Sequence, residues 1–577
     1  MCGIVAALSP PDLPPCAALD RSIEDLAHRG PDQHGVTSVL LPWTRVTLGQ
    51  ARLTIVDQTH LTVPYYFAQA GVVLAFNGEI YNWKELRHEL HDNARGLWDT
   101  SCDAEVIAWA WRVWGTECLH RFNGMWGLVL VDMLQGSVFV ARDRAGKKPL
   151  YWAKRGGRLY FASEAKALPC ELEETSCPDM EAFEFDFGES TPFLGVQRLP
   201  GGYSICLSGS ADLERPPVTR WWQLPSGTEA AAPRSYMEGV EQLTSLIVSS
   251  VVLRSTAEVP VALQLSGGLD SAIILGAWKQ VHAGNSTSLR KYCIDFAQYG
   301  IDNISAARTA AEDVALVSFD AGELAELIPR VVYHLDTPAT WSAICLWKLA
   351  ERIVADGHKI VLSGEGADEL FGGYSRYRLL YWLERMRQDP LLEAYGPTMQ
   401  HLLAGSPIDA LARLLDRSEA GEGAARVTEL ILQHGSGGRA GLARTAMRVE
   451  WHTTMQVLLR MGDRMAAAWS LENRCPFLDY RIAEFAQTLP TEWLISKDES
   501  KHILRDVARA LGVPSVIIEE RTKKGLTIPW ARWAEELGVE TAGSRGSWNR
   551  SGFANMMRAA WRKRCLRSSA CWICDQH

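Results

Sequence analysis

Residues 259–271 read Val-Pro-Val-Ala-Leu-Gln-Leu-Ser-Gly-Gly-Leu-Asp-Ser, and they decide the fold of the second half of the chain. Residues 259–265 form an apolar run typical of a buried strand, and a helix-like segment follows Ser271. The glycines allow backbone N–H groups to wrap a phosphate, and a helix amino terminus adds partial positive charge. The segment is not a P-loop, because no Gly-Lys-Ser/Thr follows, and alone it would also fit an ordinary turn.

A second strand with the same kind of ending supports the phosphate interpretation. Residues 359–362 are Lys-Ile-Val-Leu, and Ser-Gly-Glu-Gly follows at 363–366. Strands that end in glycine-rich turns before helices are typical of a parallel α/β sheet with a ligand at its carboxyl edge. We therefore predict a parallel-sheet, Rossmann-like α/β domain over residues 236–540. The Gly/Ala-rich patch at 415–441 is expected to be a loop or loosely packed insert, and 541–577 a tail.

The first 215 residues have a different texture. Short β-type runs at 72–76, 126–131, 138–141 and 159–161 alternate with helical stretches at 18–27, 83–90 and 104–114. This pattern predicts an α+β domain of two stacked sheets flanked by helices over residues 1–215. Residues 216–235, which are polar and rich in Pro and Ala from Leu224 onward, are expected to form a linker.

Cysteine is the second residue of the chain, and removal of Met1 would put its thiol and a free α-amine on one residue. A thiolate is the nucleophile in cysteine chemistry. An α-amine, with a reference pKa near about 8, can accept a proton at neutral pH without a histidine. Alternatively, Cys2 is a cysteine that merely follows the initiator.

The composition excludes several classes of function. A chain of 577 residues suggests two or three domains, and the hydrophobic and charged contents of 47% and 22% fit a globular protein. The net charge of -9 argues against nucleic acid as the main partner. With no apolar run of about 18 residues and no signal-like leader, we expect a cytoplasmic protein without membrane contact.

The thirteen cysteines show no disulfide framework and are expected to be reduced. Near the end of the chain, Cys571 and Cys574 have zinc-ligand spacing, with Cys565 and His577 nearby. Because such spacings often arise without a metal, a solvated tail is the competing interpretation.

Several short motifs of the first half occur together and in order. They are His28-Arg-Gly-Pro-Asp32, Leu48 to Ile55 with Arg52, Phe76-Asn-Gly-Glu-Ile-Tyr-Asn82, Ala141-Arg-Asp-Arg144 and Lys148-Pro-Leu-Tyr151 before Phe161-Ala-Ser-Glu164. Each alone would fit turn chemistry or surface charge. Together they resemble the class II glutamine amidotransferase domain of the N-terminal nucleophile type, over about residues 2–205, which implies an αββα sandwich.

The resemblance implies roles for single residues. Cys2 corresponds to the nucleophile, and the Asn77 amide and Gly78 N–H correspond to the oxyanion hole. Arg52 corresponds to the residue that grips the glutamine carboxylate, and Glu79 and Asp103 to those that hold its ammonium. Two departures, Cys102 in place of a usual serine and an altered stretch at 62–66, leave the nucleophile and oxyanion donors intact.

The second half carries further motifs that resemble one family. Residues 266–271 resemble the pyrophosphate loop of N-type ATP pyrophosphatases. Later motifs are Leu362 to Tyr374, Asp463-Arg-Met465 with Ser470 to Asp479, Lys501-His-Ile-Leu-Arg505 and Lys523-Lys-Gly525. To about residue 530 the chain is thus similar to the glutamine-hydrolysing asparagine synthetases, a family of carbon–nitrogen ligases.

In this family a substrate carboxylate attacks the α-phosphorus of ATP to give an acyl-adenylate and pyrophosphate. The resemblance implies that Asp270 and Asp368 hold Mg²⁺, and that Lys501 adds charge to the pyrophosphate. Glu365 corresponds to a residue tied to adenylate formation and to the ammonia proton. The remaining implied ATP contacts are Gln264, Ser266, Gly267, Gly268, Ser271, Ile294, Ser363 and Gly364.

The sequence indicates the identity of the acceptor carboxylate less clearly. Asp336 to Ser342 resembles an acidic-Pro segment near the aspartate pocket, but Thr337 stands where the family often has glutamate. Asn473 and Cys475 also replace the usual side chains. An asparagine synthetase that converts aspartate through β-aspartyl-AMP is the first hypothesis, and a tailoring amidotransferase that acts on another carboxylate is the second.

Two further alternatives are weaker. An intramolecular amide-forming cyclase needs no ammonia, so an intact glutamine site argues against it. A non-enzymatic regulator is disfavoured because both halves keep their reactive groups. Small-molecule substrates are the expected partners, and a homodimer is compatible with the resemblance because dimers occur among relatives.

Overall fold

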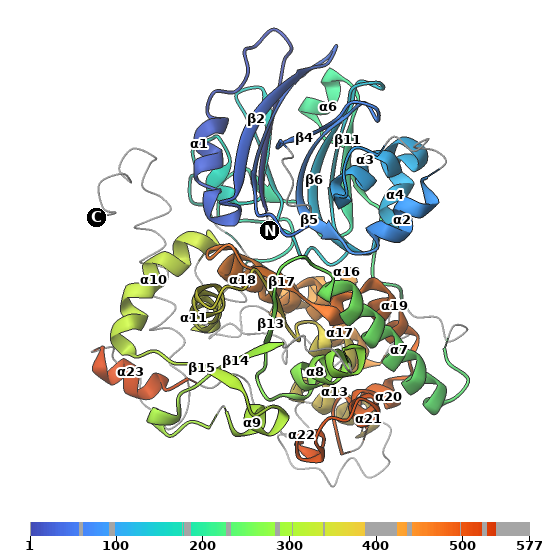
Figure 1. Cartoon of the computed structure of the whole chain (residues 1–577), viewed down its shortest axis with the longest axis vertical. Coiled ribbons are helices and arrows are strands. Elements are labelled where there is room, and N and C mark those ends of the chain that lie inside the picture. Colours follow the sequence, from blue (N-terminus) through green and yellow to red (C-terminus); the bar gives the residue numbers. More distant parts are fainter. Residues whose placement is uncertain are drawn as a thin grey trace.

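The computed structural model shows two stacked lobes, one for each half of the chain (Figure 1). The structure describes residues 2–56, 62–91, 98–175, 177, 186–226, 232–282, 289–302, 304–337, 341–386, 424–434, 441–496, 498–521 and 528–537. The Cys571/Cys574 tail and the Lys523-Lys-Gly525 motif lie outside these residues.

Two antiparallel sheets of six strands form the amino-terminal lobe. The first has the order β10-β8-β9-β1-β3-β2, with β1 (Cys2–Ser9), β2 (Gln33–Leu40), β3 (Arg45–Arg52), β8 (Tyr151–Arg155), β9 (Arg158–Ala162) and β10 (Val196–Arg198). The second has the order β12-β11-β7-β6-β5-β4, with β4 (Tyr65–Phe67), β5 (Val72–Ile80), β6 (Gly124–Asp132), β7 (Ser137–Arg142), β11 (Tyr203–Leu207) and β12 (Val218–Arg220).

The sheets pack face to face with helices outside, so the predicted αββα sandwich is confirmed (Figure 1). Alternation along β1 explains the layers: Ile4 and Ala6 join the core between the sheets, whereas Val5 packs with Ile23 of α1. The helices of this lobe are α1 (Leu19–Glu24), η1 (Ala27–Arg29), α2 (Trp83–Glu89), α3 (Asp103–Trp114), η2 (Gly115–Glu117), α4 (Cys118–Arg121), η3 (Ala165–Ala167) and α6 (Ser210–Glu214).

A parallel sheet of five strands organises the second lobe, in the order β15-β14-β13-β16-β17. Its strands are β13 (Val261–Gln264), β14 (Arg290–Ile294), β15 (Val314–Val317), β16 (Ile360–Leu362) and β17 (Glu472–Arg474). The strand order reverses between β13 and β16, and ligands of such sheets bind at the carboxyl ends beside this switch point. The predicted Rossmann-like α/β domain is therefore confirmed, and the two glycine-rich turns flank its expected ligand site.

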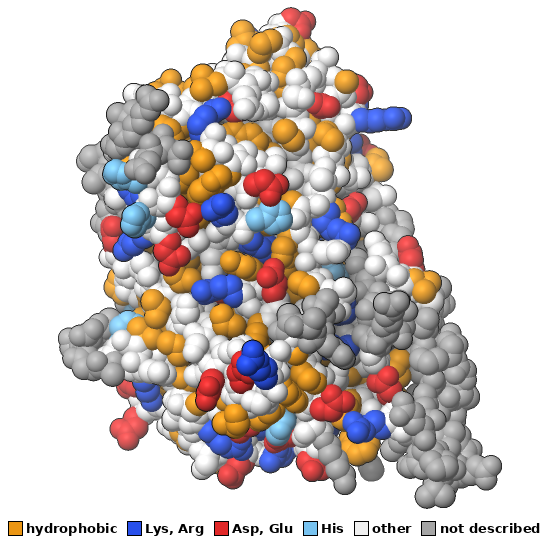
Figure 2. Space-filling view, turned by 90° about the vertical axis from the view of Figure 1, so that its right-hand side faces the viewer, with side chains coloured by type: hydrophobic (Ala, Val, Ile, Leu, Met, Phe, Trp, Pro, Cys, Tyr) orange, Lys and Arg blue, Asp and Glu red, His pale blue; other side chains and the backbone are white. Residues whose placement is uncertain are grey.

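Helices surround this sheet. They are α7 (Tyr236–Ser255), α8 (Leu269–Val281), η5 (Ala297–Tyr299), α9 (Ser305–Ala310), α10 (Ala321–Leu335), α11 (Trp341–Ala355), α12 (Ala367–Phe371), α13 (Ser375–Met386), α16 (Ala424–His434), α17 (Leu442–His452), α18 (Thr454–Ala467), η7 (Pro476–Leu478), α19 (Tyr480–Thr488), α20 (Thr491–Leu494), α21 (His502–Ala510), α22 (Ser515–Glu519) and α23 (Trp530–Glu536). In the described part of the chain, none of the helices is long and apolar enough to cross a membrane. The face in Figure 2 intersperses acidic and basic side chains without a continuous patch of either sign.

The prediction of a loop over 415–441 is wrong in part, because α16 lies within it. Val427, Leu430 and Ile431 of this helix are buried. Their spacing of three and four residues forms an apolar stripe that the surrounding glycines and alanines obscure in the sequence.

Buried ion pairs join the two lobes. Arg29, Glu164 and Asp463 have fully buried side chains, and Arg29 donates to Glu164 and to Asp463 with N–O distances of 2.7 Å. Lys148 of the amino-terminal lobe lies 3.4 Å from the opposite oxygen of Asp463. Burial alone would raise the pKa of Asp463, yet Arg29 and Lys148 lower it below its ordinary value. Asp463 therefore fixes the second lobe against two cations of the first.

We predict that Asp463→Asn destabilises the protein by about 3–5 kcal/mol, because it leaves buried cations without their partner. Urea unfolding measures this change. Glu89→Gln, which breaks the exposed pair with Arg121 at 2.9 Å, is the matched control. Its expected cost is below about 1 kcal/mol. Equal costs for the two variants would contradict the assigned role of Asp463.

Candidate active sites on two sides of one strand

Cys2 is buried at the start of β1, and its backbone is held from both sides. Its N–H donates to Asn77 Oδ1 at 3.0 Å, and its carbonyl accepts from Arg29 Nε at 2.9 Å. In the register of β1 and β3, Cys2 lies opposite Arg52. The strand pairing therefore brings the predicted nucleophile and the predicted carboxylate-binding arginine together.

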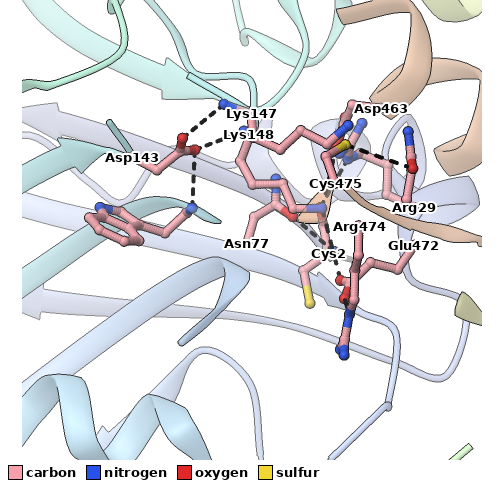
Figure 3. Close-up of polar contacts among 12 residues, drawn as sticks. Cys2, Arg29, Asn77, Asp143, Lys147, Lys148, Asp463, Glu472, Arg474 and Cys475 are labelled. Carbon is pink, nitrogen blue, oxygen red and sulfur yellow. Dashed lines mark hydrogen bonds and ion pairs between the residues drawn. The ribbon is translucent and has the colours of Figure 1, made fainter. Parts of the chain in front are cut away.

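Asn77 offers a donor next to Cys2. It lies on β5, is fully buried, and its Nδ2 group has no hydrogen-bond partner among the described residues. A buried amide donor without a partner is costly, so one that persists suits a ligand oxygen. Figure 3 shows Asn77 directly beside Cys2. This arrangement fits an oxyanion hole, with Gly78 as the next residue of the strand.

A pocket opens at Cys2. Its lining brings together the predicted glutamine-site residues with Tyr65, Cys102 and Glu472. Arg52 is oriented there by Gln33 Oε1 and the Val56 carbonyl, at 3.0 and 3.2 Å. The residues from the prediction that line it are Cys2, Arg52, Gly78, Glu79 and Asp103.

Two carboxylates of this pocket share a buried environment. Burial and the neighbouring Asp103 raise the pKa of Glu79 well above its usual range. Burial likewise raises the pKa of Asp103 to about 6, although a hydrogen bond of 2.9 Å from the Ile80 N–H acts to lower it. A substrate ammonium between the two would relieve their repulsion, which is what an α-amino acid site requires.

The predicted phosphate loop connects β13 to α8. Gly268 N–H donates to Ser266 Oγ at 3.3 Å, and Ser271 Oγ donates to the Gly268 carbonyl at 3.1 Å. Ser266 and Gly268 are exposed, so the loop presents polar groups at the sheet edge. Gln264 and Ile294 end adjacent strands, and Ser363 and Gly364 follow β16 on the other side of β13. All the predicted ATP-contact residues thus gather at one edge.

Asp270 and Asp368 converge on a single cation. Lys501 Nζ lies 2.6 Å from a carboxylate oxygen of each. Magnesium in nucleotide sites is commonly held by one or two carboxylates together with substrate phosphates, so this pair fits such an ion. Within the described ranges, no group of three or more His, Cys, Asp or Glu side chains is arranged to hold a metal.

Glu365 belongs to the loop after β16 and contacts residues at the end of β17. Its carboxylate accepts from Asn473 Nδ2 at 3.3 Å and from Cys475 Sγ at 3.1 Å. Lys147 of the amino-terminal lobe donates to it at 3.0 Å. Burial raises the pKa of Cys475 to about 12, so this group is a neutral thiol donor.

Strand β17 lies between the two sites. Successive side chains of a strand point to opposite faces. Glu472 lines the Cys2 pocket and Arg474 lies 3.4 Å from Glu79, whereas Asn473 and Cys475 contact Glu365. Figure 3 shows Glu472 and Arg474 near Cys2. One short segment of the second lobe therefore contributes to both sites.

Sequence reasoning missed Glu472 as part of the Cys2 pocket, and Arg29 and Arg474 as residues that contact Cys2 and Glu79. Their motifs were recognised, but a turn and a signature stretch do not show which pocket a side chain enters. Asp336, expected near the acceptor pocket, accepts from Arg464 at 3.1 Å and from Ala165 N–H at 2.8 Å in the lobe interface.

A pocket at a buried cysteine in one domain, beside a parallel sheet with glycine-rich turns in the other, is the arrangement of a two-domain, glutamine-dependent ligase. Comparison with known proteins agrees: residues 1–222 match the glutamine amidotransferase domain, and residues 242–572 match asparagine synthase. The chain belongs to the asparagine synthase family, which the sequence motifs indicated.

The relatives carry two kinds of name. Asparagine synthetase [glutamine-hydrolyzing] 1 of Bacillus subtilis is 29% identical, over 92% of this chain and 88% of its own. Asparagine synthetase [glutamine-hydrolyzing] 2 of Oryza sativa is 31% identical, over 88% and 73%. Amidase chry2 of Gibberella zeae is 28% identical, over 85% and 82%.

We predict that substitutions at two neighbouring residues of β17 impair different activities. Glu472→Gln should lower kcat/KM for glutamine hydrolysis about tenfold, or about 1.4 kcal/mol, because Arg474 loses its charged partner at the Cys2 pocket. Asn473→Ala should leave glutamine hydrolysis unchanged and slow ammonia-dependent amide formation. Each variant serves as the control for the other. Loss of both activities in either variant would refute the separation of the two sites by β17.

The raised pKa of Asp103 predicts a pH dependence. On the acid side, kcat/KM for glutamine hydrolysis should fall as pH drops through about 6, because a protonated carboxyl cannot pair with the substrate ammonium. Rates of glutamate release between pH 5 and 8 measure this fall in kcat/KM. In Asp103→Asn, kcat/KM should be lower and should no longer fall with pH. A flat wild-type profile between pH 5 and 7 would be inconsistent with this role.

Proposed function

We propose that this protein uses ATP and glutamine to convert aspartate to asparagine. The aspartate β-carboxylate attacks the α-phosphorus of ATP, and pyrophosphate leaves to give β-aspartyl-AMP. Ammonia from glutamine hydrolysis at Cys2 then attacks the acyl carbon, and AMP departs. The observation that carries the proposal is that the Cys2 pocket and Glu365 lie on opposite sides of one strand, β17.

The residues of the glutamine pocket suit the first half of the reaction. The Cys2 thiolate would attack the glutamine amide, and the α-amine of the processed chain would take up the proton. Asn77 Nδ2 and the Gly78 N–H would stabilise the oxyanion. Arg52 would hold the α-carboxylate, with Glu79 and Asp103 on the ammonium.

The sheet edge suits the second half. The loop of residues 266–271 would bind the pyrophosphate portion of ATP, with Lys501 adding charge. Asp270 and Asp368 would hold Mg²⁺, which neutralises the departing pyrophosphate when bound. We place the amidotransferase domain at 1–215 and the synthetase domain at 236–540, in a cytoplasmic enzyme.

A space between the lobes supports internal transfer of ammonia. A pocket at this boundary is lined by Met125 and Lys147 from one lobe and by Cys475 and Leu478 from the other. Ammonia held inside the protein stays unprotonated longer than in water, where ammonium prevails at neutral pH.

A second candidate is amidation of a different carboxylate. Two observations favour it: a relative of nearly equal similarity is named an amidase, and Glu365 is bordered by Asn473 and Cys475, which replace the side chains usual in the family. Thr337, which stands where the family often has glutamate, donates a hydrogen bond from its hydroxyl to Asp186 at 3.0 Å in the lobe interface.

The deciding experiment measures pyrophosphate release from ATP and Mg²⁺ with glutamine, comparing aspartate, no acceptor and a panel of other carboxylates. Release with aspartate, accompanied by asparagine, is the expected result. Release with another carboxylate only would establish the second candidate.

Two variants control this experiment. Cys2→Ala should abolish glutamine-dependent synthesis and spare ammonia-dependent synthesis, because only the nucleophile is lost. Asp270→Asn should abolish both by removing a magnesium ligand. Loss of both activities in a folded Cys2→Ala protein would refute the two-site scheme.

A further inference from the structure

A lysine of the amidotransferase domain reaches the synthetase centre. Lys147 Nζ lies 3.0 Å from Glu365 Oε2, and only 4% of the Lys147 side chain is exposed. No part of the family resemblance drawn from the sequence assigns Lys147 a role. An ammonium group loses rotamer freedom and hydration when it is buried in this way, so its placement calls for a reason.

The loop that carries Lys147 is rigidly built. Asp143 accepts hydrogen bonds of 2.9 Å from the backbone N–H groups of both Lys147 and Lys148 (Figure 3). Arg142 donates to the Lys148 and Gly146 carbonyls at 2.6 Å. Gly146, at φ +69°, supplies the left-handed backbone that the turn requires. The two lysines are thus presented at fixed positions toward the other domain.

The lysines face different partners. Lys148 lies near Asp463 and Glu472, the anions of the interface and of the glutamine side of β17. Lys147 contacts Glu365, on the other side. Burial opposes the charge of Lys147, but neighbouring Cys475, Glu365 and Asp463 raise its pKa above the ordinary value. The group is therefore a cation at neutral pH.

Three residues donate hydrogen bonds to the Glu365 carboxylate. Besides Lys147, its carboxylate accepts from Asn473 and Cys475, and Ser363 Oγ donates to Asn473 Oδ1 at 2.8 Å. Helix α18 approaches through Gly462, where a Cβ atom would lie 2.3 Å from Glu365 Oε1. The nearest further charges are Asp463, Arg29 and Lys148, which pair among themselves.

This arrangement suits one step of the proposed reaction. When ammonia forms the new C–N bond with the acyl-adenylate, the nitrogen becomes positively charged and must release a proton. The C–O bond to AMP breaks with its electron pair on the phosphate oxygen. A base next to the nitrogen must be ionised and correctly oriented to take the proton.

We propose that Lys147 is a positioning residue of the synthetase centre, through which the amidotransferase domain orients the Glu365 carboxylate to receive the ammonia proton. This inference rests on the proposed function. It adds a direct link between domains, because the synthetase centre is complete only with a cation from its neighbour.

The test compares Lys147→Met, Lys147→Arg and Lys166→Met in the full-length protein. Lys166 is the matched control, because it is a largely buried lysine of the same domain, 12% exposed, that pairs across the interface with Asp336 at 3.3 Å. For each variant, ammonia-dependent amide formation, pyrophosphate release and glutamine hydrolysis are measured, and thermal unfolding checks the fold.

Lys147→Met should lower kcat of ammonia-dependent amide formation about 10- to 100-fold, part of the usual contribution of a positioned base. KM for ATP and acceptor, and glutamine hydrolysis at Cys2, should be unchanged. Lys147→Arg should restore most of the rate, because it returns a cation. Lys166→Met should leave kcat unchanged even if its unfolding temperature falls.

Three outcomes would overturn the inference. They are an equal loss of both activities in Lys147→Met, a failure of Lys147→Arg to restore the rate, and the same kcat loss in Lys166→Met. If Lys147→Met does not fold, Lys147→Gln replaces it under the same criteria. Failure of the proposed function is seen separately in the wild-type protein, which would then form no asparagine, whether or not it amidates another carboxylate.

Discussion

The structure depends on a buried carboxylate, Asp463, that two cations of the other domain share. A charge without water is tolerated only when its partners are in place, so Asp463, Arg29 and Lys148 require the two lobes to meet in one relative position. Arg29 also donates to the carbonyl of Cys2. The residue that joins the domains is therefore the same one that holds the backbone of Cys2.

This arrangement explains how two chemistries can share a boundary. Glutamine hydrolysis needs a pocket for a zwitterion, whereas adenylation needs a phosphate site, and their charge requirements differ. The alternation of β17 separates them across the thickness of one strand. Glu472 and Arg474 are the charged groups on one side, and Asn473 and Cys475 contact Glu365 on the other. Only the thickness of one strand therefore separates the two sites.

Much of the fold and of the site could be predicted from the sequence, because the informative motifs are local. Ser266 to Ser271 and Ser363 to Gly366 each follow an apolar strand, and strand order then brings them to one edge. Cys2, Asn77 and Asp103 were recognised from the family resemblance of their motifs. The pairing of Arg29 with Asp463 spans 434 residues and could not be read from either motif. Strand β17, only three residues long and fully polar, carries no periodic signal of its own.

The shared strand also limits how such a protein can diverge. A one-residue insertion or deletion in β17 would turn every following side chain to the opposite face and exchange the residues of the two sites. Length variation in this segment would damage both chemistries together. Single substitutions are tolerated more easily: changes at 473 and 475 alter the surroundings of Glu365 without touching the glutamine pocket. New acceptor preferences can thus arise by replacing alternate positions of one strand while the ammonia supply is inherited intact.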